Sequence, residues 1–159
     1  MQGPVFCDVT PENLTLLETA LAQLAADLGD PYRAGNDTLH AALFASPPVC
    51  HGVLALGADQ ALLGAALFSP VMSTSAGGAG VFVSDLWVAR SARGQSVGRE
   101  LLHQVAGRAH TVWDARFMRL VSYGTNPAAG AFYARLGFSE KPDDMVLQIG
   151  GTAFEKLSR

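Results

Sequence analysis

The sequence predicts a single α/β domain built on a mixed, mostly antiparallel central sheet flanked by about four helices. Three observations support this class: the chain has 159 residues, helical and strand periodicities both occur along it, and no repeat or linker divides it. Apolar residues make up 49% of the chain and charged residues 16%, which is typical of a folded core rather than of disorder. One domain is therefore expected over residues 1–159.

The amino-terminal half is expected to contain a strand, two helices and an antiparallel meander. Residues 5–9 predict a short strand, and a helix should begin at Thr10, which can cap it, and end at Gly29. Leucines recur on one face of this helix at intervals of three and four residues: Leu14, Leu17, Leu21, Leu24 and Leu28. A second helix is expected over 36–45. Three antiparallel strands should follow at 53–56, 62–68 and 81–88, with a glycine-rich hairpin loop over 73–80.

The carboxyl-terminal half alternates between helical and strand patterns. A long amphipathic helix is expected over 95–112 and a strand over 119–123, which indicates one local parallel strand pair. Asn126 should cap a helix over 127–136. One or two closing strands are expected, at 145–149 and 152–157.

Composition argues against several classes of function. The net charge of −3 disfavours a nucleic-acid partner, because phosphate binding needs a basic face, and it suits a cationic substrate. The longest apolar stretch, 62–68, is too short to span a membrane, and the chain starts without a secretory signal, so a cytoplasmic protein is expected. Cys7 and Cys50 lack metal-ligand spacing, so no metal site is expected and both are predicted to be small buried residues.

Residues 93–98, Arg-Gly-Gln-Ser-Val-Gly, predict an anion-binding turn between a strand and a helix. The small residues at 94, 96 and 98 let the main chain approach a ligand, while Arg93 and the helix amino terminus favour negative charge. A pyrophosphate suits this chemistry. The alternative is a tight turn that needs glycine for geometry alone. Neither a Walker A lysine motif nor a Gly-x-Gly-x-x-Gly fingerprint is present.

A second motif gives this turn its context. Residues 126–138, NPAAGAFYARLGF, follow the turn, and the two together resemble the GNAT superfamily of N-acetyltransferases. Members carry an (Arg/Gln)-x-x-Gly-x-(Gly/Ala) turn and then Asn-x-x-Ala-x-x-(Phe/Leu)-Tyr-x-x-x-Gly-Phe. Ser96 stands where many members have glycine. The resemblance implies a GNAT fold whose parallel strands splay apart at the cofactor site, with acetyl-CoA as the cofactor.

The resemblance also implies which residues contact acetyl-CoA. Residues 86–88 would hydrogen-bond the pantetheine arm like an added strand, and the turn with Arg99 would hold the pyrophosphate. Asn126 would contact the arm from the opposite side. The implied cofactor-binding residues are Leu86, Trp87, Val88, Arg93, Gly94, Gln95, Ser96, Val97, Gly98, Arg99, Asn126, Phe132 and Tyr133.

Acetyl transfer by direct attack in a ternary complex needs a neutral amine, an oxyanion donor and a proton for the departing thiolate. The resemblance implies Tyr133 as the general acid and a backbone N–H near Leu86 or Trp87 as the oxyanion donor. Asp85 would accept the amine proton or order a water that does so. The structural alternatives are an aromatic packing residue for Tyr133 and a salt-bridging carboxylate for Asp85. The four histidines lie outside the motifs.

The acceptor is expected to be a small amine: a polyamine, a diamine or an amino-acid-like compound. The layout has a weaker resemblance to the diamine and polyamine acetyltransferase branch, from which Ser84 and Thr125 depart. Three residues near the end of the first helix could receive a cationic amine: Asp27, Asp30 and Tyr32. Asp85 could also contribute to this site. Two alternatives stay open, a protein amino-terminal acetyltransferase and a non-catalytic acyl-CoA-binding module. The resemblance also implies a homodimer.

Overall fold

The computed structural model describes residues 3–159. The chain forms two compact units, of which the first ends at Val121 and the second runs from Ser122 to Arg159. Two short 3₁₀ turns, Ala58–Gln60 and Arg90–Ala92, lie in the first unit. The helices and strands of the first unit are β1 (Val5–Asp8), α1 (Leu14–Leu28), α2 (Asn36–Phe44), β2 (His51–Leu56), β3 (Leu62–Ser73), β4 (Gly78–Val88), α3 (Val97–Trp113) and β5 (Met118–Leu120). Those of the second unit are α4 (Pro127–Arg135) and α5 (Gly151–Leu157).

The first unit contains a five-stranded sheet in the order β1-β2-β3-β4-β5. Neighbours from β1 to β4 are antiparallel, whereas β5 pairs with β4 in parallel, Val81 to Val83 facing Met118 to Leu120. The predicted mixed, mostly antiparallel sheet with one parallel pair is therefore confirmed. The predicted glycine-rich loop is shorter than expected, because β3 and β4 pair as far as Ser73 and Gly78.

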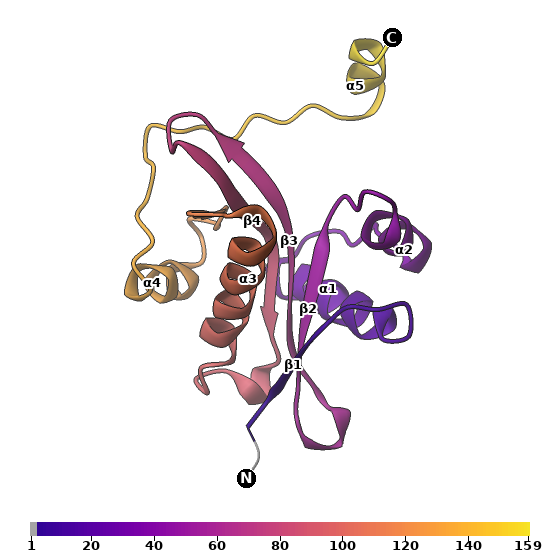
Figure 1. Cartoon of the computed structure of the whole chain (residues 1–159), viewed down its shortest axis with the longest axis vertical. Helices are drawn as coiled ribbons and strands as arrows, with labels where there is room; N and C mark the ends of the chain where they lie inside the picture. The colour runs from indigo at the N-terminus through magenta and orange to yellow at the C-terminus, as the bar shows by residue number, and fades with distance from the viewer. Residues whose placement is uncertain (1–2) are drawn as a thin grey trace. The chain divides into compact units, whose positions relative to one another are not determined.

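Helices cover both faces of this sheet: α1 and α2 lie on one face and α3 on the other (Figure 1). The buried leucines of α1 pack with Leu54 and Leu56 of β2 and with α2. Cys7 and Cys50 are half-buried against this core, and burial raises the pKa of both thiols. Across residues 3–159 no helix is long and apolar enough to cross a membrane, and no group of three or more metal-binding side chains occurs.

Helix α1 begins later than the sequence predicts. Thr10 does not cap it. Instead the Asn13 side chain accepts a hydrogen bond from the Thr10 backbone N–H at 2.7 Å, which closes a turn before Leu14. This turn satisfies the backbone locally, so Pro11 and Glu12 remain outside the helix. The predicted end is confirmed, because Gly29 adopts a left-handed conformation with φ of 75°.

The second unit confirms one element and corrects another. Asn126 caps α4 as predicted, its side-chain oxygen accepting from the Ala129 N–H at 3.2 Å. The prediction of closing strands at 145–149 and 152–157 is wrong, because the first segment pairs with no strand of the described chain and the second is helical. Alanine, glutamate, lysine and leucine favour helix in the second segment. The apolar run of the first segment forms a strand only where a neighbouring strand edge is available to pair with it, and Leu147 is 86% exposed.

Two glycines provide a test of the packing between α3 and the sheet. A Cβ at Gly64 would lie 2.8 Å from the Trp87 carbonyl oxygen and 2.9 Å from a Leu101 methyl group, so Gly64→Ala should lower the free energy of unfolding by about 1–3 kcal/mol. Gly107→Ala is the matched control, because a Cβ there meets nothing within 4 Å on the exposed side of α3. It should raise the free energy of unfolding by about 0.5–1 kcal/mol. Equal effects of both variants in chemical denaturation would contradict this packing.

Candidate active site

Strand β4 has one edge that is only partly paired. Its whole length pairs with β3, but its pairing with β5 ends at Val83. Leu67 faces Asp85 while Phe68 faces Val83, so Ser84 is an extra, bulged residue at the point where the parallel pair ends. The second half of β4, residues 85–88, therefore has one edge that no strand of the described chain covers.

The direction of the backbone groups along this edge follows from the pairing with β3. The Ala89 N–H donates to the Leu63 carbonyl at 2.9 Å, and because bonding residues alternate in antiparallel pairs, Leu86 and Val88 direct their polar groups away from β3. In agreement, the Val88 carbonyl accepts a hydrogen bond from the Arg93 side chain at 3.1 Å. An extended polar chain could therefore bind along β4 as an added strand.

The turn at 93–98 has the backbone expected of an anion site. Gly94 and Ser96 adopt positive φ angles of 77° and 65°, and α3 begins at Val97 without a side-chain cap. The first N–H groups of a helix have no partners within it, so those of α3 are available to an anion. Ser96 occupies a left-handed conformation that glycine adopts at lower cost, which explains the glycine of many GNAT members.

The cationic side chains around this turn have carboxylate partners. Asp27, at the end of α1, accepts from Arg93 at 2.7 Å and from Arg90 at 3.2 Å. Partial burial of the Asp27 carboxyl opposes the effect, but these two guanidinium groups lower its pKa overall. Arg99 pairs with the adjacent Glu100 at 3.0 Å. The predicted pyrophosphate arginines are thus present and partly neutralised, and Gln95 bonds the Ser91 carbonyl.

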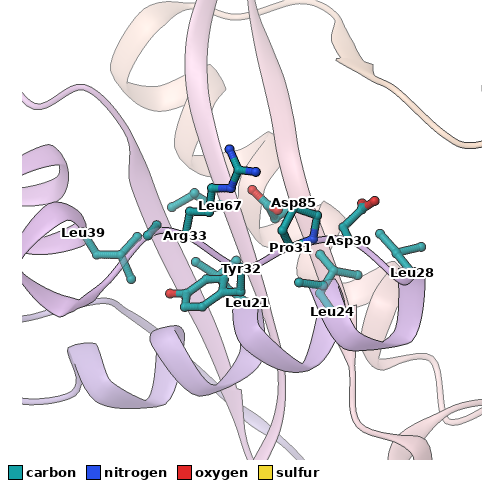
Figure 2. A pocket seen from close by; sticks show the side chains of 12 residues that line it. Leu21, Leu24, Leu28, Asp30, Pro31, Tyr32, Arg33, Leu39, Leu67 and Asp85 are labelled. Atoms are coloured by element: carbon teal, nitrogen blue, oxygen red, sulfur yellow. The ribbon is translucent and has the colours of Figure 1, made fainter. Parts of the chain in front are cut away.

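A cavity of about 270 Å³ opens between the end of α1, the loop that follows it and strands β3 and β4. Figure 2 shows its lining, with the loop residues Asp30 to Arg33 crossing between the helix and the strands. Most of the wall is apolar. The lining residues are Leu21, Leu24, Ala25, Leu28, Asp30, Pro31, Tyr32, Arg33, Ala34, Leu39, Leu67 and Asp85.

Asp85 brings a carboxylate into this mostly apolar cavity. The residue is half-buried, and desolvation raises the pKa of its carboxyl, although a hydrogen bond from Ser84 partly opposes the shift. A carboxyl with a raised pKa is a stronger base than an ordinary aspartate. Its position one residue after the bulge places it beside the free edge of β4.

The cavity gathers most of the residues predicted to bind the acceptor. Asp30, Tyr32 and Asp85 line it, whereas Asp27 is not a lining residue and is held by Arg90 and Arg93. The Tyr32 hydroxyl is buried with no hydrogen-bond partner in the described chain. Sequence reasoning missed Arg33 and the contribution of Leu24 and Leu28, because a leucine face on a helix is usually core.

The second unit contains the predicted general acid. Tyr133 lies on α4 between two other rings, with centroids 5.1 Å from Phe132 and 5.4 Å from Phe138. Burial raises the pKa of the Tyr133 phenol, so the group is protonated at neutral pH. A protonated phenol can donate to a leaving thiolate.

The histidines lie elsewhere in the described chain. His103 and His110 are exposed on α3, and His40 is exposed on α2. His51 stacks on Phe68 and contacts Trp113 edge-on beside a second cavity of about 180 Å³, and burial lowers its pKa. None of the four lines the cavity that holds Asp85.

Comparison with protein families identifies the family of this chain. The chain matches the acetyltransferase (GNAT) family over residues 18–138, which is more than half of its length. The protein therefore belongs to the GNAT acetyltransferase family. No curated protein sequence matches the chain.

Solved structures with the same fold cover nearly the whole chain. An integron cassette protein from V. cholerae is 22% identical, with a TM-score of 0.78 over 100% of this chain and 99% of its own. An aminoglycoside acetyltransferase from an uncultured soil metagenomic sample is 16% identical, with a TM-score of 0.76 over 94% and 100%. A ribosomal-protein-alanine N-acetyltransferase from Brucella melitensis biovar Abortus 2308 is 16% identical, with a TM-score of 0.74 over 92% and 100%. At these identities the likeness concerns the fold.

Proposed function

We propose that this protein transfers an acetyl group from acetyl-CoA to a small primary amine. The observation that carries the proposal is the free edge of β4, which has the anion-binding turn beyond its end and Asp85 in a cavity at its bulge. These features suit a thioester cofactor with a pyrophosphate at one end, and a small acceptor on the other side of the strand. A cavity of about 270 Å³ suits a compact amine better than a large one.

Acetyl-CoA supplies the activated acetyl group, and the residues of this chain hold it in place. The backbone groups of Leu86 and Val88 would bond the pantetheine arm, and Asn126 would be a further residue that contacts the cofactor. The N–H groups of Gly94 and of Ser96 to Gly98, at the start of α3, and the side chain of Arg93 would bind the pyrophosphate, whereas the Gln95 N–H donates to the Ala92 carbonyl. Single-domain organisation over residues 1–159, a homodimer and a cytoplasmic location belong to the same proposal.

The proton movements are assigned to two side chains. The amine nitrogen forms a bond to the acetyl carbon while Asp85, directly or through a water, accepts the proton that this nitrogen loses. The Leu86 N–H stabilises the negative charge on the carbonyl oxygen, because this group faces the free edge. As the bond to sulfur breaks, the Tyr133 hydroxyl donates its proton to the thiolate. The products are an N-acetyl amide and free CoA.

Thiol release from acetyl-CoA tests this function. The protein is incubated with separate pools of diamines and polyamines, amino acids, aminoglycosides and short peptides, and acetyl-CoA binding is followed by thermal shift. Turnover in at least one small-amine pool is expected, together with an increase in melting temperature. Binding of acetyl-CoA without turnover in any pool would support an acyl-CoA-binding module instead.

The pairing of Asp27 predicts an effect on cofactor affinity. Asp27→Asn frees Arg93 and Arg90 from a carboxylate that competes with the pyrophosphate, so the Kd for acetyl-CoA should fall roughly two- to fivefold at low salt. Asp114→Asn breaks a comparable exposed pair with Arg116 outside the turn and should leave the Kd unchanged. The measurement is isothermal titration at two salt concentrations. Weaker binding in Asp27→Asn would show that Asp27 positions Arg93 rather than competing for it.

A further inference from the structure

The charged groups that line the cavity differ from those expected for a polyamine site. Two carboxylates are present, Asp30 on the exposed loop and Asp85 on β4, and the exposed residue Arg33 also lines the cavity. Asp27, the third predicted acid, is held by Arg90 and Arg93 outside the lining. A second ammonium group in this cavity would meet the positive charge of Arg33 as well as the leucine wall.

Arg33 differs from most arginines of the described chain because no carboxylate neutralises it. Within residues 3–159 it forms neither an ion pair nor a hydrogen bond. The arginines that pair with carboxylates there are Arg90, Arg93, Arg99, Arg108 and Arg116. In the view of Figure 2 the Arg33 guanidinium lies on the opposite side of the cavity from Leu24 and Leu28. A cation at a cavity wall with no carboxylate partner is suited to binding an anionic ligand group.

From these features we infer that the acceptor is a monoamine that carries both an apolar body and a carboxylate, as an apolar amino acid does. The inference rests on the proposed function, because the amine must reach Asp85 to react. The apolar body contacts the leucines of α1 and Leu67, and the carboxylate pairs with Arg33. Arg33 is thus a specificity-determining residue.

The size of the cavity agrees with this class. A volume of about 270 Å³ lies just below the range of about 300–1,000 Å³ found for sites of drug-sized ligands. A single amino acid is small enough for such a space, whereas a long polyamine must extend out of it. The mostly apolar wall also favours a branched or aromatic body over a flexible polar one.

The test compares each apolar amino acid with the amine that lacks only its carboxylate. Leucine is paired with 3-methylbutylamine, phenylalanine with 2-phenylethylamine and methionine with 3-methylthiopropylamine, and 1,5-diaminopentane is added. Values of kcat/KM are measured by thiol release for the full chain. The wild-type protein should prefer at least one amino acid over its matched amine by roughly 10- to 100-fold, because a hydrogen bond between charged groups is lost.

The variant Arg33→Gln identifies the residue responsible. It should lower kcat/KM for the preferred amino acid by roughly 10- to 100-fold and leave the value for the matched amine unchanged. Arg116→Gln, outside the cavity, should change neither value. A wild-type preference for the amine or the diamine, or an equal loss with both partners of a pair in Arg33→Gln, would overturn the inference while the proposed function stands. The absence of turnover with every acceptor pool would overturn both the inference and the proposed function.

Discussion

Replacing Tyr133 with phenylalanine should lower kcat about 10²- to 10⁴-fold while the Kd for acetyl-CoA stays near the wild-type value. The departing thiolate loses its proton donor, whereas the phenylalanine ring keeps the edge-on contacts with Phe132 and Phe138. Burial raises the pKa of this phenol, so the group stays protonated at neutral pH and is available as a donor. The measurements are steady-state thiol release and isothermal titration of acetyl-CoA.

A control separates the hydroxyl of Tyr133 from its packing. Phe138→Leu disturbs the ring environment of Tyr133 and leaves the hydroxyl in place. It should lower the free energy of unfolding by about 1 kcal/mol and retain most of kcat. If Tyr133→Phe turns over at the wild-type rate, the general acid is another group and the proposed mechanism is wrong at that step.

Periodicity and turn chemistry predicted most of the fold. The helix expected over 95–112 is Val97–Trp113, because its apolar residues recur at helical spacing and the glycine turn precedes them. The parallel pair of β4 and β5 followed from the helix between them. The strand at 145–149 was not correctly predicted, since a short apolar run forms a strand only when a neighbouring strand edge is available, and this depends on the whole fold.

Some residues of the candidate site could be predicted from the sequence and others could not, because the positions of the latter depend on how distant parts of the chain fold together. Asp85 and Tyr32 both line the cavity. The sequence could suggest them because members of one family place corresponding residues at corresponding positions of the fold. The pairing of Asp27 with Arg93 joins residues 66 positions apart, and nothing in their local sequence indicates it. The exposure of the Arg33 side chain to the cavity depends likewise on the path of the loop between α1 and α2, which periodicity does not describe.

Replacing Asp85 with asparagine should lower kcat/KM about 10²- to 10⁴-fold, because the amide cannot accept the amine proton. In the wild-type protein kcat/KM should fall as the pH drops through the raised pKa of Asp85, since only the carboxylate acts as a base. The variant should lack this limb of the pH profile. Asp37→Asn removes an exposed carboxylate on α2, outside the cavity, and should retain both the rate and the limb. An unchanged limb in Asp85→Asn would assign the base to another group.

Stability gives an independent test of the environment of Asp85. The folded-state pKa lies above the unfolded value of about 3.9, so the folded protein binds the proton more tightly than the unfolded chain does. The free energy of unfolding therefore decreases as the pH rises from the unfolded pKa through the folded one, and the penalty persists at neutral pH. Asp85→Asn carries no such penalty, so denaturant titration should find it more stable than the wild type at pH 7, with the difference shrinking below about pH 4. A variant that is both inactive and more stable would show that the chain keeps a poorly solvated carboxylate at the cost of stability, as a catalytic base requires.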